Sequence, residues 1–193
     1  MLWNLLKNSS TQASAIKNQK KNIISICRFV DQKNIFEILE IAKKLQIYNF
    51  IILGNGYLFE KAKIFLKSNN IKNVYLFGKK IDVFKYLYES DLFLSTSLYE
   101  GHPISILEAM SIGLPIVASK VTGNIDTVKD NYSGFFYKLG DINEACNCIE
   151  RIMKNNDIKL KISSNAFFTH RNLFTIAKMK NSYSQLYGKY KRN

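Results

Sequence analysis

The sequence has few of the features that mark secreted, metal-binding or membrane-spanning proteins. Its three cysteines, Cys27, Cys146 and Cys148, are odd in number and form no C-x-x-C pair. A disulfide framework and a zinc site are therefore not expected, and the thiols should be small buried side chains in a reducing compartment. No apolar run reaches transmembrane length, and the apolar start at residues 1–7 is too short for a signal-peptide core. We expect a cytoplasmic protein.

Acidic residues and arginine are also scarce. Lysine and arginine number 28 against 15 aspartate and glutamate residues, which gives a net charge of +13, and only four of the basic residues are arginine. Two interpretations stay open: a solvated lysine-rich surface, or a surface that meets an anionic partner or makes a peripheral contact with the inner face of a membrane. Nucleic acid is not expected as a partner, because no aromatic residues alternate with the basic ones in a recognisable RNA-binding motif.

Two common phosphate-binding loops are missing. No G-x-x-x-x-G-K-[ST] sequence occurs, and Gly54-Asn55-Gly56 lacks the third glycine of the dinucleotide fingerprint. These absences argue against a P-loop nucleotidase and against NAD binding. No Ser/His/Asp or Cys/His set indicates a hydrolase. We expect neither an organic cofactor nor a metal.

What is present is an alternation of short apolar runs with helical patterns. Strands are expected at 22–27, 50–53, 73–77, 92–95, 115–118 and 134–137, and helices or helical turns at 33–45, 58–66, 83–89, 103–112 and 126–128. This pattern is typical of the α/β class with a doubly wound, parallel, Rossmann-like sheet. Further on the pattern is helical only, at 142–153, 158–168 and 173–190. The predicted parts are a polar lead-in with one loose helix at 1–21, a Rossmann-like domain at 22–172 and a C-terminal helix at 173–193.

Loops at the carboxyl ends of the strands should form the binding site, because ligands of such sheets bind there. The residues that follow the predicted strands are Arg28, Gly54, Gly78, Ser97 with Glu100, and Gly123. Arg28 and Lys33 flank the junction of the first strand and helix, and a basic pair beside free helix N–H groups suits a diphosphate. Spacing alone leaves a solvated pair as the alternative.

The stretch from Tyr99 to Met110 predicts a loop followed by a short helix with two carboxylates. Glu108 lies on a mostly apolar helix, where an unpaired carboxylate is costly. Helical side chains lean toward the N-terminus, so Glu108 and Glu100 should face one space. The alternative for Glu100 is a favourable interaction with the helix dipole. His102 is a candidate ligand contact, with an incidental loop histidine as the alternative.

This set of motifs resembles the retaining glycosyltransferases of family 4. The matching residues are Glu100-Gly101-x-Pro103…Glu108-Ala109-Met110 and Gly113-Leu114-Pro115-Ile116-Val117-Ala118-Ser119, preceded in order by Arg28…Lys33, Gly54-Asn55-Gly56, Val74…Gly78 and Asp91…Ser97. The resemblance runs from about residue 22 to the C-terminus. It implies the C-terminal, donor-binding domain of a two-domain GT-B enzyme.

The resemblance also implies roles for single residues. Arg28 and Lys33 would hold the donor diphosphate and stabilise the charge of the leaving group, Glu100 would orient the transferred sugar, and Glu108 would bind the ribose. The catalytic residues would be Glu100, Arg28 and Lys33. The donor-binding residues would be Arg28, Lys33, Gly54, Ile81, Glu100, Gly101, His102, Pro103, Ile104 and Glu108.

The function implied is metal-independent, retaining transfer of a hexose-type sugar from a UDP- or GDP-sugar to a glycan or lipid-linked acceptor. The chain matches one of the family's two domains, so we expect a truncated enzyme, or half of a split one that acts with a separate acceptor-domain chain. Little transfer is expected from this chain alone, and its last helix resembles the one that crosses back to the first domain. A non-catalytic nucleotide-sugar-binding or partner subunit is the alternative. Asn34 and His102 depart from the family, which usually has glycine and an aromatic or apolar residue there.

Overall fold

The computed structural model describes residues 20–190, and the predicted lead-in at 1–21 lies almost entirely outside this range. Within it, six strands form one sheet in the order β3-β2-β1-β4-β5-β6. All neighbouring pairs are parallel. The strands are β1 (Asn22–Ile26), β2 (Asn49–Leu53), β3 (Val74–Gly78), β4 (Leu92–Ser95), β5 (Ile116–Ser119) and β6 (Gly134–Tyr137). The predicted doubly wound α/β class is confirmed.

The order of the strands creates one topological switch point. The chain moves outward from β1 through β2 to β3, and then returns to the other side of β1 with β4. Ile23 of β1 accordingly pairs with Phe50 on one side and with Leu92 on the other. The connections at the carboxyl ends of β1 and β4 therefore diverge, which opens a crevice between them.

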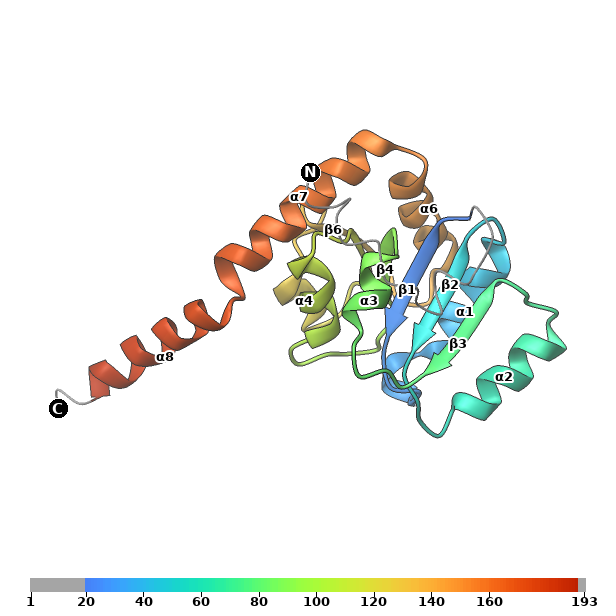
Figure 1. Cartoon of the computed structure of the whole chain (residues 1–193), viewed down its shortest axis with the longest axis horizontal. Helices are drawn as coiled ribbons and strands as arrows, with labels where there is room; N and C mark the ends of the chain where they lie inside the picture. Colours follow the sequence, from blue (N-terminus) through green and yellow to red (C-terminus); the bar gives the residue numbers. More distant parts are fainter. Residues whose placement is uncertain (1–19, 191–193) are drawn as a thin grey trace.

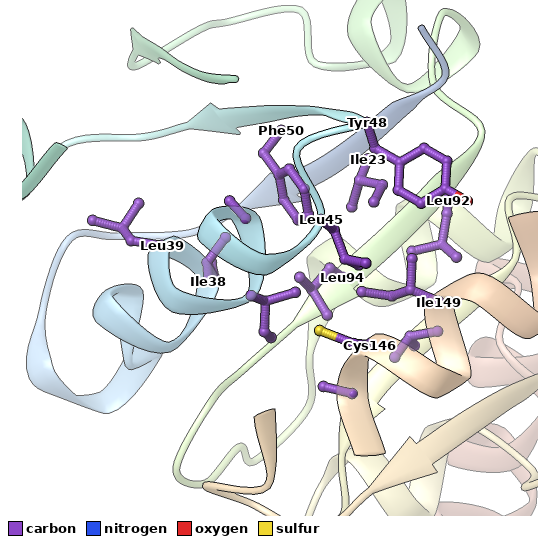
Figure 2. Packing of buried hydrophobic residues seen from close by; sticks show 14 of the residues in the cluster. Ile23, Ile38, Leu39, Leu45, Tyr48, Phe50, Leu92, Leu94, Cys146 and Ile149 are labelled. Atoms are coloured by element: carbon purple, nitrogen blue, oxygen red, sulfur yellow. The ribbon is translucent and has the colours of Figure 1, made fainter. Parts of the chain in front are cut away.

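Helices cover both faces of the sheet (Figure 1). The side chains of β4 alternate, so that Leu92 and Leu94 face one layer and Phe93 faces the other. The first layer contains α1 (Ile35–Lys44), α2 (Phe59–Ser68) and α6 (Ile142–Met153), and Figure 2 shows part of its core. The second contains α3 (Phe84–Tyr88) and α4 (Ile104–Ser111), while α7 (Asn156–Leu173) packs against both α4 and α6.

The first helix begins later than its periodicity predicts. Asn34 adopts the left-handed conformation, with φ 49°, between a 3-10 turn, η2 (Asp31–Lys33), and α1. Its side-chain amide donates to Glu37 Oε2 at 2.6 Å, which helps to hold this turn. Asparagine tolerates the left-handed region better than most residues, so it can stand where the family usually has glycine. Lys33 consequently lies in the turn before α1 and not on the helix.

The last two helices also differ from prediction. α7 continues to Leu173, and α8 (Ile176–Tyr190) begins after a short break. Figure 1 shows α8 extending away from the sheet and its covering helices. One side of α8 carries exposed apolar residues: Ile176, Met179, Tyr183, Leu186 and Tyr187. In the part of the chain that the structure describes, no helix is both long and apolar enough to cross a membrane.

Candidate functional site

A cleft of about 570 Å³ opens at the carboxyl ends of β1 and β2 and the start of α4. It lies on the β1 side of the topological switch point, where the fold predicts a ligand. Its lining includes residues from the four loops that follow β1, β2, β3 and β4. These are Ile26, Cys27, Arg28, Lys33, Leu53, Gly54, Asn55, Lys79, Lys80, Val83, Glu100, His102, Pro103, Ile104 and Ser105.

The lining of the cleft is strongly cationic. Among the described residues that form it, four are lysine or arginine and one is a carboxylate, Glu100. The Arg28 side chain is exposed and makes no hydrogen bond or ion pair within residues 20–187. Lys80 Nζ lies 5.9 Å from the centre of the Tyr86 ring at the outer wall. This excess of positive charge favours an anionic ligand.

Lys33 and Glu100 form an ion pair inside the cleft. Lys33 Nζ donates to Glu100 Oε1, and the two side chains are only 15% and 9% exposed. The Ser97 hydroxyl donates to the same carboxylate oxygen at 2.6 Å. Two residues separated by 67 positions are thus brought into direct contact by the turn after β1 and the loop after β4. The cleft places a buried carboxylate and its counter-ion side by side.

The N-terminus of α4 forms one wall of the cleft. Pro103 precedes the helix and its carbonyl accepts from the N–H groups of Ile106 and Leu107. The N–H groups of Ile104 and Ser105, by contrast, have no acceptor among residues 20–187. Free N–H groups at a helix N-terminus carry partial positive charge and bind anions such as phosphates. The helix adds to the charge of the cationic side chains.

Two glycines permit the close approach of the loops. A Cβ atom at Gly54 would lie 1.8 Å from the carbonyl oxygen of Cys27, beside Arg28. Gly123 has φ 83°, and a Cβ atom there would lie 2.3 Å from the carbonyl oxygen of Glu100. The Glu100 N–H donates to the Thr122 carbonyl at 3.1 Å, which fixes the same contact from the other side. The contact of Gly54 with Cys27 and the contact of Gly123 with Glu100 therefore both require a residue without a side chain.

The cleft combines most of the residues that the sequence singled out. Arg28, Lys33, Gly54, Glu100, His102, Pro103 and Ile104 all line it. Gly101, Ile81 and Glu108 do not, and Ile81 is fully exposed. Glu108 lies one turn along α4, so the expected common space for both carboxylates is not formed by this cavity. Its side chain is partly buried without a partner in residues 20–187, and this burial raises its pKa.

Several lining residues were not predicted as site residues, among them Asn55 and Ser105. Thr96 was also missed, although its buried hydroxyl lies 2.9 Å from the Lys33 carbonyl oxygen. A small polar residue directly after a buried apolar strand is the signal that could have indicated it. His102 both lines the cleft and contacts Phe174 between α7 and α8, with ring centres 6.1 Å apart.

The chemistry of the cleft is that of binding and charge stabilisation. Burial raises the pKa of the Cys27 thiol to about 12, so this lining residue is a neutral thiol and not a nucleophile near neutral pH. In the described range, no group of three or more His, Cys, Asp or Glu side chains is arranged to hold a metal ion. Positive side chains and free N–H groups are what the cleft offers to a ligand.

Comparison with known proteins matches the chain to one sequence family. The sequence profile of the family "Glycosyl transferases group 1" matches residues 7–167. The chain is 33% identical over 168 residues to the UDP-Gal:alpha-D-GlcNAc-diphosphoundecaprenol alpha-1,3-galactosyltransferase of Escherichia coli, covering 83% of this chain and 43% of that protein. It is 31% identical over 153 residues to the poly(ribitol-phosphate) alpha-N-acetylglucosaminyltransferase of Staphylococcus aureus, covering 76% and 31%. The chain thus spans less than half the length of these relatives.

Solved structures show the same fold. A crystal structure of an S. aureus TarM variant with fondaparinux, alpha-GlcNAc-glycerol and UDP superposes with a TM-score of 0.81 at 27% identity, covering 86% of this chain and 35% of TarM. Anabaena Alr3699/HepE with UDP and glucose superposes with a TM-score of 0.82, covering 96% of this chain and 54% of that one. At 21% identity, the second likeness concerns the fold alone.

Proposed function

The chain belongs to the glycosyl transferases of group 1, and we propose that its cleft binds the nucleotide-sugar donor of the transfer reaction. The observation that carries this proposal is the cationic cleft at the switch point, where Arg28, Lys33 and the N-terminus of α4 meet. A nucleoside diphosphate needs this combination of charge-assisted donors and helix N–H groups. We propose a UDP- or GDP-sugar of hexose type as the donor.

The diphosphate would lie between the first loop and α4. Arg28 has no competing partner in residues 20–187, and the N–H groups of Ile104 and Ser105 are unpaired there. Glu100 would accept hydrogen bonds from hydroxyl groups of the sugar, because its Oε2 atom has no donor within this range. Glu108 would accept from the ribose, and the loop at 79–81 would flank the base.

Charge stabilisation is then the main contribution of this chain to catalysis. As the glycosidic bond breaks, negative charge develops on the leaving diphosphate, and Arg28 and Lys33 lie where they would stabilise it. This arrangement supports a metal-independent reaction. We propose retention of configuration by attack on the same face of the sugar, because Glu100 would hold sugar hydroxyl groups and no second carboxylate lies in the described lining to act as a nucleophile. The acceptor would be a glycan or a lipid-linked glycan.

Isothermal titration with UDP, GDP and their hexose derivatives tests the donor site. Arg28→Met should weaken binding of the best ligand by about tenfold to a hundredfold, the effect of losing a charged hydrogen bond. Lys67→Met is the matched control, since it also removes one exposed positive charge but lies at the far end of α2. Absence of binding at millimolar ligand, or equal losses in both variants, would refute the proposal.

A second candidate function is a non-catalytic or partner subunit that supplies the donor site to another chain. One observation favours it: α8 exposes an apolar side. Gel filtration with an acceptor-domain protein encoded nearby would test it. A complex that transfers sugar would support a split enzyme in the cytoplasm, whereas a complex without transfer would support the non-catalytic role.

A further inference from the structure

Two adjacent buried hydroxyl groups contact the two loops that carry Lys33 and Glu100. Thr96 and Ser97 directly follow β4 and are 1% and 3% exposed. The Thr96 hydroxyl lies 2.9 Å from the Lys33 carbonyl oxygen, and the Ser97 hydroxyl donates to Glu100 Oε1 at 2.6 Å. We propose that Thr96 and Ser97 are separate positioning residues, Thr96 for the phosphate-binding turn and Ser97 for the sugar-binding carboxylate. This inference rests on the proposed donor site.

Thr96 acts on the backbone of the turn that carries Lys33. Its hydroxyl lies within hydrogen-bond distance of two successive carbonyl oxygens, of Lys33 at 2.9 Å and of Asn34 at 3.1 Å. Asn34 has the left-handed conformation, so the turn departs from regular helix at this point. A hydroxyl that shares its one hydrogen between both carbonyl groups fixes the direction in which Lys33 leaves the turn. Thr96 should therefore affect phosphate binding without contacting the ligand.

Ser97 acts on the side chain of Glu100. Glu100 Oε1 accepts from both Lys33 and Ser97. A bound diphosphate attracts Lys33 and thereby competes for the first of these donors. Ser97 is neutral and almost fully buried, so it remains on Oε1 and keeps Oε2 directed at the sugar. Ser97 should therefore matter most when phosphate and sugar are bound together.

A buried polar network stands behind Ser97. The Ser119 hydroxyl donates to the Ser97 carbonyl at 2.6 Å, and the Asn124 amide donates to the Ser119 carbonyl at 3.0 Å. Ser119 and Asn124 are both 0% exposed, and Asn124 Oδ1 has no partner among the described residues. Buried polar groups cost stability unless they are hydrogen-bonded, and a hydrogen-bonded network holds one conformation. The network fixes the backbone from which Ser97 reaches Glu100.

The test compares the affinity for UDP with that for UDP-sugars by isothermal titration. The probes are UDP with UDP-glucose, UDP-galactose and UDP-N-acetylglucosamine, and GDP with GDP-mannose. Ser97→Ala should reduce the affinity for the best nucleotide-sugar about tenfold and leave the affinity for the bare diphosphate within about twofold. Thr96→Val keeps the shape of the side chain and should reduce both affinities by the same factor. Ser97→Thr keeps the hydroxyl, so the ratio of its affinity for the nucleotide-sugar to its affinity for the bare diphosphate should equal that of the wild type.

Ser111→Ala is the matched control, because its hydroxyl donates to the Glu108 carbonyl outside the cleft lining. Its affinity ratio should equal that of the wild type. If Ser97→Ala does not fold, Ser97→Cys, which keeps a weaker donor, should change the ratio in the same direction. Equal losses for sugar-bearing and bare diphosphates in the Ser97 variants would overturn the inference while leaving the donor site in place. A wild-type chain that binds none of the probes would overturn both.

Discussion

Replacing Gly123 by alanine tests whether the loop that carries Glu100 has room to move. Gly123 has φ 83°, and a Cβ atom there would lie 2.3 Å from the carbonyl oxygen and 2.8 Å from the Cβ atom of Glu100. These are atoms on or next to the backbone, so no flexible side-chain end can yield. Either the Glu100 loop or the start of α5 (Asn124–Thr127) must shift.

The expected loss of stability has two parts. A left-handed backbone costs a residue with a Cβ atom about 1–2 kcal/mol. The overlap with Glu100 adds about 1–3 kcal/mol, the usual cost of overpacking a well-packed site. Gly140→Ala separates the two, because Gly140 has φ 84° and a Cβ atom there would meet no atom within 4 Å. Gly140→Ala should therefore lose only the stability that the left-handed backbone costs.

Urea unfolding followed by circular dichroism measures both variants, and titration with UDP-sugars measures the site. Gly123→Ala should unfold at a lower urea concentration than Gly140→Ala. It should also bind the nucleotide-sugar less tightly, because Glu100 is displaced. If the two variants unfold at the same urea concentration and bind ligand equally, the close contact does not position Glu100 and the reasoning is wrong.

Three further predictions concern the partly buried Glu108 carboxyl and the buried thiols. Glu108→Gln should weaken binding of nucleoside diphosphates by about 1–3 kcal/mol in a titration, since an amide replaces a charged acceptor; unchanged affinity would contradict a ribose contact. The same change should raise the free energy of unfolding at neutral pH by less than about 1 kcal/mol. Burial raises the folded-state pKa of Glu108, so the ionised carboxylate destabilises the folded chain once the pH has risen through that value. The neutral amide of glutamine avoids this loss. Burial raises the pKa of Cys27 to about 12 and of Cys148 to about 11. Iodoacetamide at about pH 8 should therefore label these thiols in urea but not in the folded chain, as mass spectrometry would show.

The fold could be predicted from the sequence because buried parallel strands are short, continuous apolar runs. Two of them, Leu92–Ser95 and Gly134–Tyr137, have the predicted bounds. The predicted start of α1, at residue 33, was wrong. Asn34 adopts a left-handed conformation, which the periodicity of apolar residues does not predict. The predicted end of α7, at residue 168, was also too early. The apolar pattern weakens there, whereas the helix continues to Leu173.

The cleft could be predicted in outline but not in its contacts. Topology alone brings the ends of β1, β2 and β4 together, and so it places Arg28 near Glu100. The pairing of Lys33 with Glu100 depends on how two loops, 67 residues apart, direct their side chains. Sequence spacing contains no such information. The position of Glu108 relative to the cavity depends in the same way on the rotation of α4.

The position of Glu100 in the cleft predicts that the chain distinguishes the donor from the diphosphate product. Glu100 is 9% exposed, and its Oε2 atom has no donor in the part of the chain whose side chains are described. Hydroxyl groups of a sugar can donate to Oε2, whereas a bare diphosphate cannot. The nucleotide-sugar should therefore bind more tightly than the nucleoside diphosphate, by about tenfold. In Glu100→Gln this preference should largely vanish, because the amide presents no charged acceptor to the sugar. Equal affinities in the wild type would show that the sugar does not contact Glu100.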